Sequence, residues 1–72
     1  MESSDSAPVD IGDELVLEIE ETGEEGDGIA HRQGFTIIVP GASLGERIEG
    51  RIRHLEADYA VAELVRHESG VD

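Results

Sequence analysis

The sequence predicts an all-β fold, a small barrel of five short strands. Apolar and polar residues alternate with a period of two in several segments, which is the pattern of half-buried strands. Glycine and proline turn signals separate these segments at regular spacing, as they do in small barrels. One segment also carries a glycine in its interior, which is typical of the sharp bends at barrel corners. With 72 residues, the chain is long enough for one domain.

The first predicted strand covers residues 14–20, ELVLEIE, and follows a Gly-Asp turn signal. The apolar residues Leu15, Leu17 and Ile19 alternate with Val16, Glu18 and Glu20. One face of this strand is therefore expected to be buried and the other to face water. A glycine-rich acidic connection, residues 21–27, follows it.

The second and third predicted strands, residues 28–32 (GIAHR) and 35–39 (FTIIV), form a hairpin. The dipeptide Gln33-Gly34 between them predicts a tight turn in which Gly34 has a positive φ. Pro40 ends the third strand, because proline has no backbone N–H to donate to a neighbouring strand.

The fourth predicted strand covers residues 47–53, in which Ile48 and Ile52 share a face with Gly50. A turn at residues 56–58 leads to the fifth predicted strand, residues 59–66. The surrounding sequence LEADYAVAELVRH also fits an amphipathic helix, because it is rich in alanine, leucine and glutamate. Alternation of small apolar residues with bulkier or polar ones favours the strand.

Charge is the most informative feature of the composition. Eighteen aspartates and glutamates stand against five arginines and no lysine, which gives a net charge of −13. This composition indicates adaptation to concentrated salt; the alternative is an acidic interaction domain at ordinary salt. At 1 M salt the Debye length is about 3 Å, so long-range repulsion of RNA phosphates is screened. Net charge is then weak evidence against RNA binding.

The residues give no support for a catalytic, metal or cofactor site. The chain has no cysteine, its three histidines lack the spacing of metal ligands, and no phosphate-binding loop is present. The acidic run GEEGDG, residues 23–28, lacks the alternating ligands of a calcium loop and is expected to be a hydrated turn. We therefore expect no enzyme activity and no cofactor.

The order and spacing of several short motifs resemble the TRAM domain family. These are EGDGIA at residues 25–30, GF at 34–35, VPGA at 39–42, GE at 45–46, RI at 51–52 and AE at 62–63. The resemblance covers about residues 12–67 and implies a five-stranded OB-like barrel that binds RNA. TRAM domains occur fused to RNA-modifying enzymes, and they also occur alone in archaea as small proteins that act like cold-shock proteins. Two positions depart from the family, since Ile38 and Val61 stand where aromatic residues are common.

The sequence offers a small set of candidate RNA-binding residues, whose side chains could stack on bases or contact phosphates. They are Phe35, Tyr59, His31, Arg32, Arg51 and Arg53. The alternatives stay open at this point. Phe35 has the parity of Ile37 and Val39, which fits a core residue. The arginines of the fourth strand either form a basic stripe for RNA or pair with neighbouring glutamates.

The predicted organisation is an acidic disordered tail at residues 1–8, a barrel domain at 9–68 and a second tail at 69–72. The predicted function is single-stranded RNA binding, as an RNA chaperone or a module associated with tRNA, rRNA or RNA-modifying enzymes. The alternative is a protein-interaction subunit that contacts no RNA and uses an apolar patch of Val16, Ile38 and Val61. We expect a cytoplasmic protein, because no segment is apolar for long enough to span a membrane. We also expect a monomer.

Overall fold

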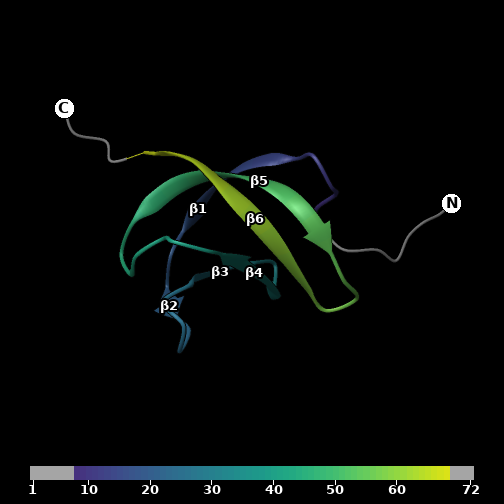
Figure 1. The fold of residues 1–72 in the computed structure, drawn as a ribbon. Helices are drawn as coiled ribbons and strands as arrows, with labels where there is room; N and C mark the ends of the chain where they lie inside the picture. Colours follow the sequence, from purple (N-terminus) through teal and green to yellow (C-terminus); the bar gives the residue numbers. More distant parts are fainter. Residues whose placement is uncertain (1–7, 69–72) are drawn as a thin grey trace, which may run out of the picture.

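A computed structural model describes residues 8–68 of the chain. It contains six β-strands: β1 (Glu14–Glu18), β2 (Glu21–Thr22), β3 (Gly28–Arg32), β4 (Phe35–Val39), β5 (Arg47–Leu55) and β6 (Tyr59–His67) (Figure 1). The two predicted tails lie outside the described residues, except for Pro8, which is exposed. No helix of the described part has the length and apolar character needed to cross a bilayer.

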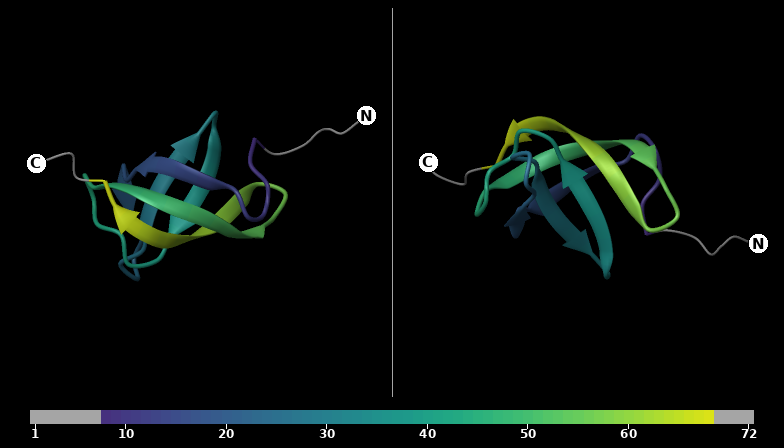
Figure 2. Two further views of the ribbon diagram at one scale, coloured as in Figure 1. Left: turned by 90° about the horizontal axis from the view of Figure 1, so that it is seen from above. Right: turned by 60° about the horizontal axis from the view of Figure 1, so that its bottom comes forward.

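The strands form one strongly curled sheet in the order β1-β5-β6-β4-β3-β2. All neighbours are antiparallel except β4 and β6, which pair in parallel. The long pair of β5 and β6 arches over the short hairpin of β3 and β4 (Figures 1 and 2). The two edge strands of this sheet, β1 and β2, follow each other in the chain, so the sheet curls into a small barrel. The prediction of an all-β, OB-like barrel is confirmed.

The segment predicted as one strand over residues 14–20 is split, and this makes the strand count six instead of five. Residues up to Glu18 pair with β5. Ile19 leaves the ladder, because its N–H and C=O bond to Glu46 and Gly45 in the loop before β5, at 2.8 and 2.9 Å. Glu20 then donates its N–H to the carbonyl of Ile29 in β3 at 2.8 Å. The segment thus changes partner strands at Ile19, and the sequence pattern does not reveal this exchange.

The other predicted strands are present, and the helix alternative for the last segment is wrong. β5 ends two residues later than predicted and β6 one residue later. The turn between β3 and β4 has the predicted positive φ at Gly34, 81°, and a second positive φ at Gln33, 55°. Two positive φ values are the signature of the type I′ turn that suits a two-residue hairpin.

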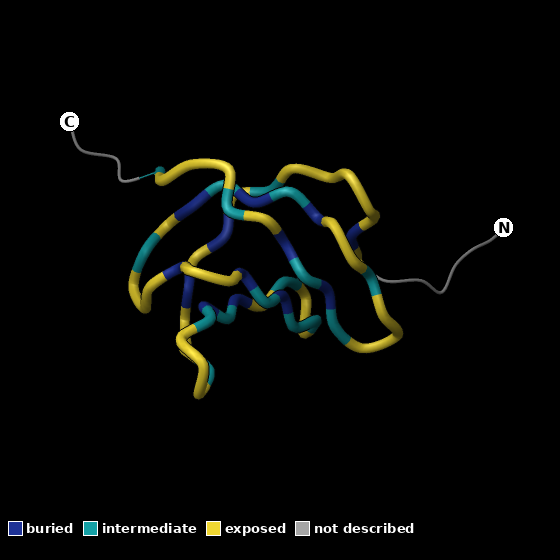
Figure 3. The backbone as a smooth tube through the Cα atoms, in the orientation of Figure 1, coloured by how far each residue is buried: buried dark blue, intermediate teal, exposed yellow. Residues whose placement is uncertain are grey.

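The core lies inside the curled sheet and consists of aliphatic side chains. Buried residues alternate with more exposed ones along β3, β4, most of β5 and the first half of β6 (Figure 3). Its most deeply buried large side chains are Ile37, Ile48, Ile52 and Val39.

Two buried glycines let segments of this small core approach closely. A Cβ at Gly28 would lie 2.8 Å from that of Ala42, and one at Gly50 would lie 3.2 Å from that of Ala62. Gly28 therefore has no room for a side chain, and at Gly50 a side chain would require Ala62 to shift by a few tenths of an ångström.

Two β-bulges shape the β5–β6 pair. Ile52 is opposite Ala62 and His54 is opposite Val61, so Arg53 is the extra residue of one bulge. Val65 is the extra residue of the other, because Gly50 is opposite Leu64 and Glu49 is opposite Arg66. Bulges increase the local twist, which helps a sheet this small to close.

Candidate functional site

The outer face of β3, β4 and the first part of β6 carries two rows of partly exposed side chains. In register, Ile29 lies next to Ile38, and Ile38 lies next to Val61. Next to this apolar row, His31 lies beside Thr36, and Thr36 beside Tyr59. We call these six residues the carboxylate-free patch, because none of them is an aspartate or glutamate: Ile29, His31, Thr36, Ile38, Tyr59 and Val61.

The outer face of β1, β5 and the far part of β6 is different, because its arginines lie beside glutamates. Arg47 Nη2 lies 3.0 Å from Glu18 Oε2, and Arg53 Nε lies 3.3 Å from Glu63 Oε1. We call this region the ion-paired face.

The closest pairs on the ion-paired face change the acidity of their members. Arg51 Nε donates to Glu14 Oε2 at 2.9 Å, and its Nη2 contacts the same oxygen. The hydrogen bond and the charge of Arg51 lower the pKa of Glu14, and Glu14 raises the pKa of Arg51. Arg66 Nη2 lies 2.7 Å from Glu49 Oε1, and this pairing raises the pKa of Arg66. An RNA phosphate would have to compete with a carboxylate at each of these arginines.

Arg32 is the one arginine within residues 8–68 that has no carboxylate beside it. It donates from Nη2 to the carbonyl of Val16 in β1 at 2.8 Å, across the seam between the β1 and β3 segments. Arg32 is half-buried and lies opposite Phe35 in the ladder. The predicted basic residues fall into two groups, Arg51 and Arg53 on β5 and Arg32 beside the tight turn. Only Arg32 has a guanidinium without a carboxylate partner in residues 8–68.

The two aromatic residues do not share a face. Phe35 is partly buried and packs against the core, as its parity with Ile37 indicates. Tyr59 lies on the carboxylate-free patch and is partly exposed. A continuous surface of Phe35, Tyr59 and arginines, which would have been the clearest sign of an RNA-binding face, is therefore absent from the described residues.

The apolar surface suggested for a protein partner is also not continuous. Ile38 and Val61 are neighbours, but Val16 lies on β1, and β5 separates it from β6. Sequence reasoning named Ile38 and Val61 as departures from the family and as part of an apolar patch with Val16, and it missed Ile29 and Thr36. Strand parity could have placed these two residues on the outer face, but only the register between strands shows that all four lie together.

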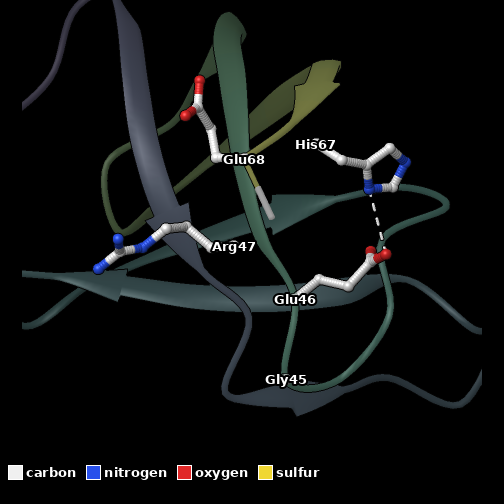
Figure 4. A pocket seen from close by; sticks show the side chains of 5 residues that line it. All are labelled: Gly45, Glu46, Arg47, His67 and Glu68. Atoms are coloured by element: carbon white, nitrogen blue, oxygen red, sulfur yellow. Dashed lines mark ion pairs between the residues drawn. The ribbon is translucent and has the colours of Figure 1, made fainter. Parts of the chain in front are cut away.

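Each histidine in the structure lies beside a glutamate. His31 Nδ1 is 3.3 Å from Glu20 Oε1 at the margin of the patch, and His54 contacts Glu56. His67 Nδ1 is 3.1 Å from Glu46 Oε2 in an open hollow at the end of β6, where Arg47 and Glu68 point away from this pair (Figure 4). Within residues 8–68, no group of three or more histidine or acidic side chains is arranged to hold a metal ion.

Comparison with known proteins identifies the family of this chain. A family model described as the TRAM domain matches residues 8–65. Similar proteins include translation initiation factor 2 subunit beta of Picrophilus torridus, which is 48% identical over 56 residues. That match covers 78% of this chain and 27% of that protein. Another is ribosomal RNA large subunit methyltransferase E of Haloarcula marismortui, 47% identical over 60 residues, with 83% of this chain and 23% of that protein covered.

A solved structure shares both the fold and much of the sequence. The solution structure of a conserved protein of Methanococcus maripaludis superposes with a TM-score of 0.79 at 38% identity. The match covers 83% of this chain and 86% of that chain. By contrast, the chain spans less than a third of the length of the curated relatives it matches. From the family match and the shared barrel, the chain belongs to the TRAM domain family.

Proposed function

We propose that this chain is a module that binds single-stranded RNA, and that the carboxylate-free patch is its contact surface. The single observation that carries the proposal is the distribution of carboxylates over the strands. RNA phosphates are repelled by carboxylates at contact distance even where salt screens the long-range field. The patch is the stretch of the outer face of the strands where a polynucleotide meets an aromatic ring, a histidine and aliphatic side chains, and its acidic neighbours, Glu20 and Glu21, lie only at the β2 margin.

Tyr59 is the residue of the patch best suited to hold a base. Stacking on an aromatic ring is tolerant of sequence and stabilises a bound base by about 1–3 kcal/mol. With aliphatic residues at Ile38 and Val61, the patch has one stacking platform, so the module holds few bases tightly. His31 offers a second ring in the same row, with Thr36 between it and Tyr59. Arg32 lies in register with Phe35 and donates to Val16 in β1, so its guanidinium is turned away from the patch.

The names of the relatives support a role near the translation apparatus. One group is named translation initiation factor 2 subunit beta and the other ribosomal RNA large subunit methyltransferase E. We therefore place this module in the cytoplasm, with tRNA, rRNA or another RNA as its ligand, acting as an RNA chaperone or beside an RNA-modifying enzyme. Several relatives come from halophilic archaea, which fits a surface adapted to concentrated salt.

The test is fluorescence anisotropy with a labelled ten-nucleotide oligouridylate in molar KCl. Tyr59→Ala is expected to weaken binding by about 1–3 kcal/mol while the melting curve stays close to that of the parent. Arg51→Ala is the matched control on the ion-paired face, and it is expected to change the affinity much less. Equal affinity of the parent and a folded Tyr59→Ala protein would contradict the stacking role.

A second candidate function is contact with a protein partner through the same surface. The row of Ile29, Ile38 and Val61 favours it, because contiguous apolar side chains on a surface mark protein contacts. If the parent protein binds no RNA at any salt concentration, this function becomes the leading one.

A further inference from the structure

The outer edge of β6 is open beyond Val61. On the side that faces β4, β6 is paired only from Tyr59 to Val61. β4 ends at Val39, and the next residue, Pro40, has no N–H with which to continue the ladder. β6 itself runs on to His67, so within residues 8–68 its second half has a backbone partner on the β5 side alone.

The peptide groups of Leu64 point to this open edge. Ile52 in β5 donates its N–H to Asp13 at 2.9 Å and accepts from Gly12 at 2.7 Å, so both of its peptide groups point away from β6. Ala62 lies opposite Ile52, so these two residues form a pair without mutual hydrogen bonds. The N–H and C=O of Ala62 therefore also point away from β5. The direction alternates along a strand, so Leu64, two residues further on, also turns its N–H and C=O away from β5. It offers one donor and one acceptor side by side.

An open hollow of about 440 Å³ lies at this edge. It is lined by Pro40, Arg53, Val61, Ala62, Glu63 and Leu64. Arg53 and Glu63 form an ion pair at 3.3 Å, so their charges offset each other. The remaining lining is apolar side chain and strand backbone.

We propose that this hollow binds one unstacked nucleobase of single-stranded RNA. The proposal rests on the RNA-binding function proposed above and adds a subsite to it. The N–H and C=O of Leu64 match the neighbouring acceptor and donor on the Watson–Crick edge of a base, the edge that proteins read in single-stranded RNA. Pro40 and Val61 contact the faces of the ring. Val61 belongs both to the carboxylate-free patch and to the lining of the hollow. A bound RNA that crosses the patch therefore reaches the hollow directly.

A base fits this site better than a phosphate or an added peptide strand does. Arg53, the one basic side chain of the lining, is already paired with Glu63, so a phosphate would have to compete with a carboxylate there. A peptide that extends a sheet needs several successive residues with free peptide groups. Here the bulge at Val65 interrupts the ladder directly after Leu64, so an added strand would find a single well-placed pair.

Amide chemical shifts of the full chain in molar KCl test the subsite. Titration with ten-nucleotide oligouridylate is expected to shift the Leu64 amide together with the amides of the patch. An abasic ribose-phosphate oligomer of the same length is expected to leave the chemical shift of the Leu64 amide unchanged. If RNA shifts the patch and leaves Leu64 unchanged, the subsite is refuted and the RNA-binding function stands. If no amide shifts with RNA, both are refuted.

Two charge variants of one loop give an independent test by anisotropy. Pro40→Glu adds a carboxylate to the wall of the hollow and is expected to weaken oligouridylate binding about tenfold, the loss of one base contact. Ser43→Glu adds the same charge to an exposed position of the same loop and is the control, with affinity close to that of the parent. Equal affinities for the two variants would contradict the subsite, as would shifts of Leu64 with the abasic oligomer.

Discussion

The ion-paired face and the carboxylate-free patch differ in how their charges are arranged. The ion-paired face on β1, β5 and the far part of β6 contains carboxylates and offsets them with four arginines. The carboxylate-free patch on β3, β4 and the start of β6 has no acidic side chain and needs no arginine. The comparison shows that four of the arginines already lie beside glutamates. A phosphate has to compete with glutamate for an arginine that is already paired. On the proposed account, RNA therefore binds the surface that has neither charge.

A third region, the connection between β1 and β3, is strongly acidic and is expected to make the fold depend on salt. The connection from Glu20 to Asp27 holds five carboxylates, and within residues 8–68 only His31 forms an ion pair with it. Salt screens the repulsion among such groups and strengthens apolar burial. The largest expected effect is therefore a drop of about 20 °C or more in melting temperature from molar KCl to ~0.1 M KCl. Calorimetry at both salt concentrations measures it, and superposable curves would contradict salt adaptation.

The two aromatic residues lie in different environments, Phe35 against the core and Tyr59 on the patch. Alanine substitutions are expected to affect stability to different extents at the two positions. Phe35→Ala removes a ring that packs against the core, so it is expected to lower the free energy of unfolding by about 2 kcal/mol. Tyr59→Ala removes a ring on the patch and is expected to lower it by much less. Chemical denaturation in molar KCl measures both. A Phe35→Ala protein as stable as its parent would return Phe35 to the list of exposed stacking residues.

The smallest expected effect concerns pH on the ion-paired face. Arg51 lowers the pKa of Glu14 below its ordinary value of 4.5 in the folded protein. The stabilisation from this pair is therefore complete above pH 4.5 and is lost as the pH falls through the lowered pKa. Glu14→Gln should melt slightly below the parent at pH 7, and the gap should close in acid. The pair is exposed, so the gap is small. A gap that widens in acid would contradict this assignment.

The sequence predicts the strands better than it predicts their partners. Alternation places Ile37 and Val39 inside and indicates that Phe35 points the same way, as the structure shows. Alternation cannot show that the chain exchanges β5 for β3 at Ile19, because that depends on the loop around Gly45. It also cannot place Tyr59 beside Thr36 or Glu14 beside Arg51. Those neighbours follow from a parallel pairing and from register across distant strands, which depend on how the whole sheet closes.

The most direct test of the central claim places the same new charge on each of the two surfaces. Thr36→Glu puts a carboxylate in the middle of the patch, and Val16→Glu puts one on the ion-paired face at a side chain that is 48% exposed. Anisotropy with labelled oligouridylate in molar KCl then gives both affinities, beside a melting curve for each variant. The expected result is a loss of at least tenfold in affinity for Thr36→Glu and no change for Val16→Glu, with both proteins folded. Loss of binding by Val16→Glu with retention by Thr36→Glu would place the RNA on the arginines of β5 and contradict the account.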